Sequence, residues 1–208
     1  MRRRERLIVL GLMAGCLVPA AARKGWAADL VIVRTYDAVG VPPSALAEAR
    51  GVAAAILTGA DLRISWLVCS APAGAESPCS VPLKPHEVVV RIVAAPPQVS
   101  ASALGSALVD ISTGAGALAT IYEDHVEATA AHAGGDAGSL LGRTMAHEIG
   151  HLLIGNGGHA GGGLMRGRWS DREVRGHAVQ DWTFSPADVA LIHQHLLGMS
   201  DEDAGAED

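Results

Sequence analysis

The segment at residues 147–151, which reads HEIGH, constrains the fold of this chain more than any other feature of its sequence. On an α-helix its two histidines lie one turn apart on the same face, because side chains at i and i+4 are neighbours. Two neutral imidazoles placed in this way can bind one zinc ion. The glutamate between them then lies beside the metal and can accept a proton from a bound water. His147 and His151 are therefore predicted metal ligands, and Glu148 is the predicted general base.

The residues before the motif favour a helix. Residues 138–146 contain no proline, and Asp136 is suited to cap the helix N-terminus. Apolar residues recur at helical spacing at Leu141, Met145, Ile149 and Leu152. We expect this stripe to face the core, roughly opposite a histidine face that lines a cleft. The alternative is that the two histidines merely occupy the polar face of an ordinary helix.

A third ligand is expected, because a catalytic zinc ion usually has three protein ligands and an open position for water. The helix cannot supply it from the same face, so the chain must turn back. Glycine and asparagine at residues 155–158 tolerate the left-handed conformation that ends helices, and this turn can return His159 to the metal. Glu173 is the alternative third ligand, and Asp171 and His177 are weaker candidates.

The whole run, HEIGHLLIGNGGHAGGGLM, resembles the active-site region of the metzincin clan of zinc peptidases. In that clan a helix with HExxH is followed by a glycine turn, a third histidine and a methionine turn beneath the metal. The resemblance implies one catalytic zinc ion held by His147, His151 and His159, with Glu148 as general base and Met165 in the supporting turn. The spacing here is HExxHxxxGxxxH, whereas the usual pattern is HExxHxxGxxH. This departure indicates a divergent, bacterial, matrixin-like group.

The rest of the chain predicts an α+β fold. Short apolar or alternating segments predict strands at residues 30–33, 62–68, 87–93, 107–111 and 117–122, the last two joined as a hairpin. Periodic segments predict further helices at residues 44–57, 124–132 and 186–197. The resemblance implies a metzincin-like catalytic domain with a twisted mixed sheet of about five strands, an active-site helix, a methionine turn and a C-terminal helix. In that clan an edge strand pairs with the extended substrate, and residues 117–122 are the expected counterpart.

The ends of the chain and its cysteines predict an exported protein. Residues 1–22 combine a basic segment, an apolar stretch and small residues, which predicts a signal peptide, with cleavage as late as residue 28 as an alternative. Lipid anchoring through Cys16 is a minor alternative. We expect the metallopeptidase domain to span residues 29–198 and residues 199–208 to form an acidic, disordered tail. Cys69 and Cys79 flank a short polar loop, which in an exported protein predicts a disulfide.

The composition argues against some classes of binding partner. The net charge is −6 at pH 7 and no basic aromatic stripe occurs, so nucleic-acid binding is not expected. No other apolar run has the length of a membrane span. We expect a monomeric, secreted or periplasmic zinc endopeptidase that hydrolyses peptides or proteins. Two alternatives stay open: a catalytically weak envelope binding or assembly module that keeps the zinc site, and a zinc amidase acting on a cell-wall amide.

Overall fold

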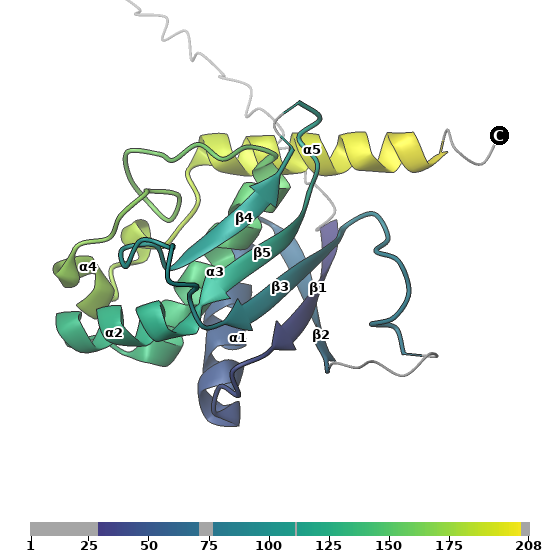
Figure 1. Ribbon diagram of the computed structural model, residues 1–208. Coiled ribbons are helices and arrows are strands. Elements are labelled where there is room, and N and C mark those ends of the chain that lie inside the picture. The colour runs from purple at the N-terminus through teal and green to yellow at the C-terminus, as the bar shows by residue number, and fades with distance from the viewer. Residues whose placement is uncertain (1–28, 71–76, 111, 205–208) are drawn as a thin grey trace, which may run out of the picture.

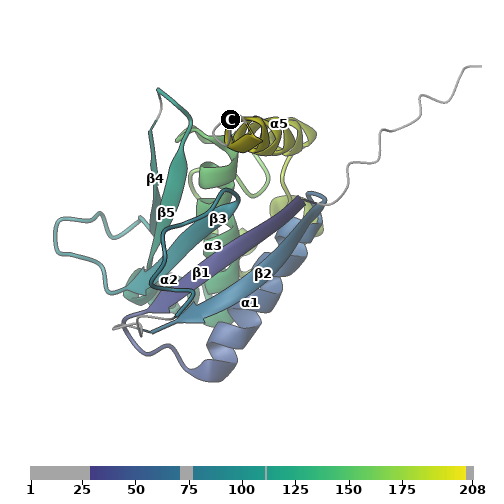
Figure 2. The ribbon, with the colours of Figure 1, turned by 90° about the vertical axis from the view of Figure 1, so that its right-hand side faces the viewer.

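A mixed β-sheet and the helices packed on one of its faces make up the fold in this computed structural model (Figures 1 and 2). The structure describes residues 29–70, 77–110 and 112–204, with side chains described as far as residue 198. The expected signal peptide and Cys16 lie outside the described residues. No helix in the described part of the chain is long and apolar enough to cross a membrane.

The sheet has five strands in the order β2-β1-β3-β5-β4. Four strands are parallel: β1 (Asp29–Asp37), β2 (Leu62–Cys69), β3 (Glu87–Val93) and β5 (Gly116–Tyr122). The last, β4 (Gly105–Val109), pairs antiparallel with β5, so the expected hairpin is confirmed. The α+β fold class with a mixed five-stranded sheet is likewise confirmed.

The prediction that residues 117–122 form an edge strand is wrong. Residues 117–122 lie in β5, which is hydrogen-bonded to β3 on one side and to β4 on the other. An interior strand has no free backbone groups for a peptide. The edge on this side of the sheet is β4, which the alternation pattern alone could not distinguish from its hairpin partner.

Two helices form the layer behind the sheet. They are α1 (Pro43–Thr58) and α3 (Ala137–Ile154), and they contact each other extensively. Small residues allow this close approach: a Cβ built at Gly142 of α3 would lie 2.7 Å from Cβ of Val52 in α1. Ala49 and Ala53 of α1 are fully buried in the same layer. The core is therefore built from alanines and branched aliphatic residues in tight contact.

Helix α3 is buried on every side, which differs from the amphipathic helix expected from its apolar stripe. It contacts α1, β4, β5, α2 (Glu123–Ala133) and α5 (Pro186–Ala204). Even Arg143 is buried, because its guanidinium donates to the carbonyl oxygens of Val174 and Gly176 and lies 4.0 Å from the ring centre of Trp182. Sequence periodicity could not reveal this, because the polar face of α3 is covered by chain segments that are distant in sequence.

The C-terminal part of the chain completes the fold. A short helix, α4 (Asp171–Arg175), and a 3-10 turn, η1 (Val179–Asp181), precede α5. Ser185 caps α5, because its Oγ accepts from the backbone N–H of Asp188. The helix continues to Ala204, beyond the boundary expected at residue 198. An acidic composition predicts solvation, but it does not prevent a proline-free segment from extending a helix.

Two side-chain contacts outside the candidate site connect different segments of the chain. The predicted disulfide between Cys69 and Cys79 is confirmed, with their Cα atoms 5.8 Å apart. His193 of α5 is buried, and its ring nitrogens lie 3.0 Å from Asp29 Oδ2 and 3.0 Å from the Ala60 carbonyl oxygen. His193 therefore joins α5 to β1 and to the segment after α1 from within the core.

Candidate active site

Helix α3 carries the first part of the candidate site. It begins where expected, because the Asp136 carboxylate accepts from the backbone N–H of Ser139 at 2.6 Å. His147, Glu148 and His151 lie on the third and fourth turns and are each less than 7% exposed. A helix fixed on all sides by the core therefore sets the positions of these three side chains.

A left-handed glycine ends α3 and reverses the chain. Gly155 has φ 76°, and its N–H donates to the carbonyl oxygen of His151. A Cβ at this position would lie 2.9 Å from the carbonyl oxygen of Gly114 in the β4–β5 hairpin, so the turn requires glycine for two reasons. The chain then brings His159 back toward the helix. Its neighbour Ala160 donates to the Met165 carbonyl oxygen at 2.7 Å, which closes the following loop.

The three histidines of the run come together. Their ring nitrogens offer three possible ligand atoms that all lie within 4.8 Å of one another. The Nε2 atoms of His147 and His151 are 3.1 Å apart, and the His159 ring centre lies 5.0 Å from that of His151. His159 is exposed while the other two are buried, so the cluster opens toward solvent on the His159 side.

The hydrogen bonds of the two buried imidazoles favour a cation between them. His147 Nδ1 lies 2.8 Å from the Leu164 carbonyl oxygen, and His151 Nδ1 lies 3.0 Å from the Asn156 carbonyl oxygen. A carbonyl oxygen accepts a hydrogen bond and cannot donate one, so both Nδ1 atoms carry hydrogen and both Nε2 atoms carry lone pairs. Two lone pairs that face each other at 3.1 Å repel unless a cation lies between them. This donor set fits zinc, for which imidazole nitrogen is a preferred ligand.

Burial shifts the pKa values of the two buried histidines toward the neutral form, which is the form that binds a metal. Desolvation lowers the pKa of His147 to about 4, and it also lowers the pKa of His151. Both imidazoles are therefore neutral at pH 7, which is the form that binds a metal. Desolvation raises the pKa of Glu148 to about 8 in the absence of a cation.

Glu148 lies against the edge strand of the sheet. A Cβ built at Gly105, the first residue of β4, would lie 2.7 Å from Cγ and 2.7 Å from Oε1 of Glu148. Only glycine leaves room for the carboxylate at this point. Gly105 could not be selected from the sequence, because its role depends on a contact with Glu148, which lies 43 residues further along the chain.

Met165 lies beneath the helix that carries the histidines. It is 2% exposed, and a Cβ at Gly150 would lie 2.8 Å from its Sδ. The preceding residue, Leu164, supplies the carbonyl that accepts from His147. The methionine turn therefore packs on the helix between the two buried histidines and also orients one of them.

The structure separates Glu173 from the histidine cluster. Its carboxylate pairs with Arg166 and completes a capping box with Ser170 at the start of α4. These hydrogen bonds and the nearby arginine lower its pKa. Asp171 and His177 do not join the cluster either, since Asp171 lies 3.8 Å from His132 and His177 lies beside Arg143. Among the candidates from the sequence, His159 alone reaches the two helix histidines.

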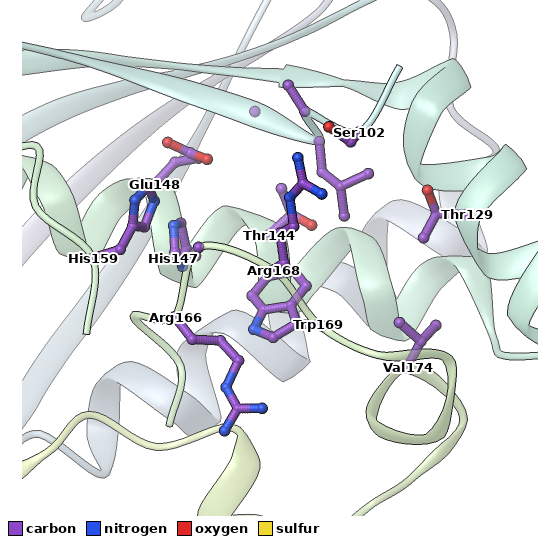
Figure 3. A pocket seen from close by; sticks show the side chains of 14 residues that line it. Ser102, Thr129, Thr144, His147, Glu148, His159, Arg166, Arg168, Trp169 and Val174 are labelled. Carbon is purple, nitrogen blue, oxygen red and sulfur yellow. The ribbon is translucent and has the colours of Figure 1, made fainter. Parts of the chain in front are cut away.

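A pocket of about 300 Å³ adjoins the cluster (Figure 3). His147, Glu148 and His159 line one end of it. The opposite walls come from the approach to β4, from α2 and α3, and from the segment after the methionine turn. Trp169 of that segment lies in the wall, with its ring centre 5.5 Å from that of His147 and 4.9 Å from that of Trp182. It therefore both anchors its segment on Trp182 and borders the pocket.

The order of elements and the three converging histidines are those that the resemblance to the metzincin clan implies. No family model matches the sequence, and no curated protein does. Among solved structures, the chain is similar to archaemetzincin from Methanopyrus kandleri, with 14% sequence identity and a TM-score of 0.49 over 85% of this chain and 99% of that one. It is also similar to a zinc-dependent peptidase from Methanocorpusculum labreanum, with 14% identity and a TM-score of 0.49 over 77% of this chain and 99% of that one.

Proposed function

We propose that this chain is a zinc-dependent peptidase of the metzincin type. The observation that carries the proposal is the histidine cluster, in which two imidazoles held by backbone carbonyls turn their free Nε2 atoms toward each other. His147, His151 and His159 would hold one zinc ion. Three protein ligands leave a position for water, as in catalytic rather than structural zinc sites.

When bound, zinc would supply Lewis-acid chemistry, lowering the pKa of a water molecule and polarising the scissile carbonyl. Glu148 is the group of this chain that moves the proton. It lies on the same helix, between the two histidines in sequence, and it borders the pocket. Its carboxylate would accept a proton from the attacking water and deliver it to the leaving amine. The backbone carbonyls of Leu164 and Asn156 would keep His147 and His151 in the required tautomer.

The edge strand β4 is suited to hold an extended substrate. It ends the sheet on the side of the site, and Gly105 places it directly against Glu148. A peptide that adds to this edge by backbone hydrogen bonds would pass the carboxylate and the histidine cluster. This role belongs to β4 rather than to residues 117–122.

The disulfide supports an extracytoplasmic location. Disulfides such as Cys69–Cys79 persist in oxidising compartments and are rare in the cytosol. This agrees with the signal peptide expected at residues 1–22. We therefore propose that the enzyme acts on peptides or proteins outside the cytoplasm.

Elemental analysis and peptide hydrolysis test this function together. We expect about one zinc ion per wild-type molecule, a large loss of zinc in His159→Ala, and retained zinc without hydrolysis in Glu148→Gln. Glu173→Gln serves as the matched control and should keep its zinc. Full zinc retention in His159→Ala would contradict the proposed ligand set. Wild-type protein that binds zinc but cleaves no peptide in a broad library would contradict the peptidase function and favour a binding module.

A further inference from the structure

The pocket beside the histidine cluster contains an arginine that pairs with no other residue in the part of the chain that the structure describes. Arg168 lines the pocket and is exposed. In the described part of the chain its guanidinium forms no hydrogen bond or ion pair. Figure 3 shows its side chain extending toward the side of the pocket where Ser102 lies. An arginine with all its donors available can bind a carboxylate through two parallel hydrogen bonds.

The other arginine of the pocket is already neutralised. Arg166 pairs with Glu173, and in Figure 3 its side chain points away from Ser102, to the side opposite Arg168. Glu148 is the one carboxylate among the lining residues, and the proposed reaction uses it. The charge available to a ligand in this pocket is therefore the single positive charge of Arg168.

The remaining walls suit a short side chain with a polar end. Hydroxyl groups of Ser102 and Thr129 line the pocket on the β4 and α2 sides, and Trp169 and Val174 supply apolar surface. The free volume of about 300 Å³ is enough for one amino-acid side chain together with part of its backbone. The lining thus combines an apolar wall for methylene groups, hydroxyl donors and one cation.

We propose that this pocket binds a carboxylate of the substrate next to the scissile bond, with Arg168 as its partner. The inference rests on the proposed peptidase function and adds a substrate class to it. Because His147 and Glu148 line the same pocket, a carboxylate bound at Arg168 belongs to a residue close to the reacting carbonyl. An acidic side chain and a free C-terminal carboxylate supply the same chemistry.

Hydrolysis of matched peptides tests the preference. The first series consists of peptides blocked at both ends, each with a single glutamate at a different position. Each of these peptides has a matched partner with glutamine at the same position. A third peptide has glutamine and a free C-terminal carboxylate. For the wild type we expect kcat/KM to be about tenfold higher for a carboxylate peptide than for the blocked glutamine peptide. The blocked glutamate peptide identifies an acidic side chain as the ligand, and the third peptide identifies the chain terminus.

Variants of Arg168 assign the preference to this residue. In Arg168→Ala the ratio of kcat/KM between carboxylate and amide peptides should fall to about one, and in Arg168→Glu it should fall below one, because two carboxylates repel each other. Arg172→Ala, an exposed arginine of α4 that does not line the pocket, is the control and should keep the wild-type ratio. Equal cleavage of carboxylate and amide peptides by the wild type, or a preference retained in Arg168→Ala, would overturn the inference.

Binding separates this inference from the peptidase function. The Kd values of the same peptides for zinc-loaded Glu148→Gln and for Glu148→Gln/Arg168→Ala can be measured by calorimetry. We expect about tenfold tighter binding of the carboxylate peptide by the first protein and no difference for the second. If carboxylate binding depends on Arg168 but the wild type hydrolyses no peptide, the proposed peptidase function is wrong and the proposed carboxylate pocket is supported. If the wild type hydrolyses peptides but carboxylate binding does not depend on Arg168, the peptidase function is supported and the proposed carboxylate pocket is wrong.

Discussion

The Nδ1 atom of His147 lies 2.8 Å from the carbonyl oxygen of Leu164, which immediately precedes Met165. This contact joins the helix and the methionine turn, two parts of the motif that are separated by the glycine-rich loop. The turn therefore acts on the site through a backbone carbonyl as well as through the methionine side chain. Changes in the turn should affect the histidine cluster even though no turn residue belongs to it.

The first prediction concerns Met165. Its side chain is buried against Gly150, so Met165→Ala should leave a cavity and lower the free energy of unfolding by about 2–4 kcal/mol. Met165→Leu keeps most of the volume and should cost less than about 1.5 kcal/mol. Urea denaturation of the metal-free proteins measures both values. Equal stability of the two variants would mean that Met165 does not support the helix by packing.

Gly105 should matter for catalysis more than for stability. A methyl group at this position meets the flexible end of Glu148, so Gly105→Ala should displace the carboxylate at little cost in unfolding free energy. We expect kcat to fall about tenfold to a hundredfold with zinc content unchanged, because the displaced group is the proposed general base. Leu108→Ala, on the exposed face of the same strand, is the control. Wild-type kcat in Gly105→Ala would show that the carboxylate does not depend on this contact.

The close contact of α1 and α3 predicts a different effect for Gly142. Here an added methyl group meets the backbone of Ala49 and the Cβ of Val52, neither of which can move independently of α1. We expect Gly142→Ala to lower the free energy of unfolding by about 1–3 kcal/mol. Gly51→Ala is the matched control, because nothing lies within 4 Å of its added Cβ, and it should stabilise α1 by about 0.5–1 kcal/mol. Thermal denaturation of the two variants should therefore shift in opposite directions.

The pKa of Glu148 predicts a pH dependence for the metal-free protein. Burial raises this pKa to about 8 from the usual 4.5, so between these values the folded state holds a proton that the unfolded state releases. The stability contributed by the protonated group is present below pH 4.5 and is lost as the pH rises through 8. Relative to Glu148→Gln, which cannot ionise, the metal-free wild type should lose roughly 2–4 kcal/mol of unfolding free energy between pH 5 and pH 8.

Zinc provides the internal control for this pH dependence. A nearby cation favours the ionised carboxylate, so the difference between wild type and Glu148→Gln should shrink when both proteins are loaded. The low pKa of His147 acts equally in both proteins and cancels in the comparison. A stability difference independent of pH in the metal-free proteins would mean that Glu148 is ionised in the folded state at neutral pH.

Local patterns in the sequence were enough to predict most elements of the fold. The helix with the motif, its Asp136 cap and the hairpin of β4 and β5 each depend on residues close together in the chain. The short spacing between Cys69 and Cys79 likewise predicted their disulfide. These predictions succeeded because hydrogen bonding, capping and loop closure act over a few residues.

Contacts between distant segments were not visible in the sequence. The strand order places β4 rather than β5 at the edge, and no alternation pattern encodes that order. The burial of His193 depends on Asp29, 164 residues away. The choice of His159 over Glu173 depends on where the chain returns after Gly155, and the pairing of Glu173 with Arg166 became apparent only in three dimensions.

The burial of α3 on every side has a consequence for metal exchange. Amide hydrogens in the middle of such a buried helix exchange with solvent through openings whose free energy approaches that of global unfolding. His147 and His151 therefore lie on a helix that the core holds on all sides, whereas His159 lies on an exposed loop closed by the hydrogen bond between Ala160 and Met165. Zinc would enter and leave when the loop that carries His159 moves, while His147 and His151 stay in place as a preformed pair of ligands. The metal-free protein would then keep its shape and rebind zinc without refolding.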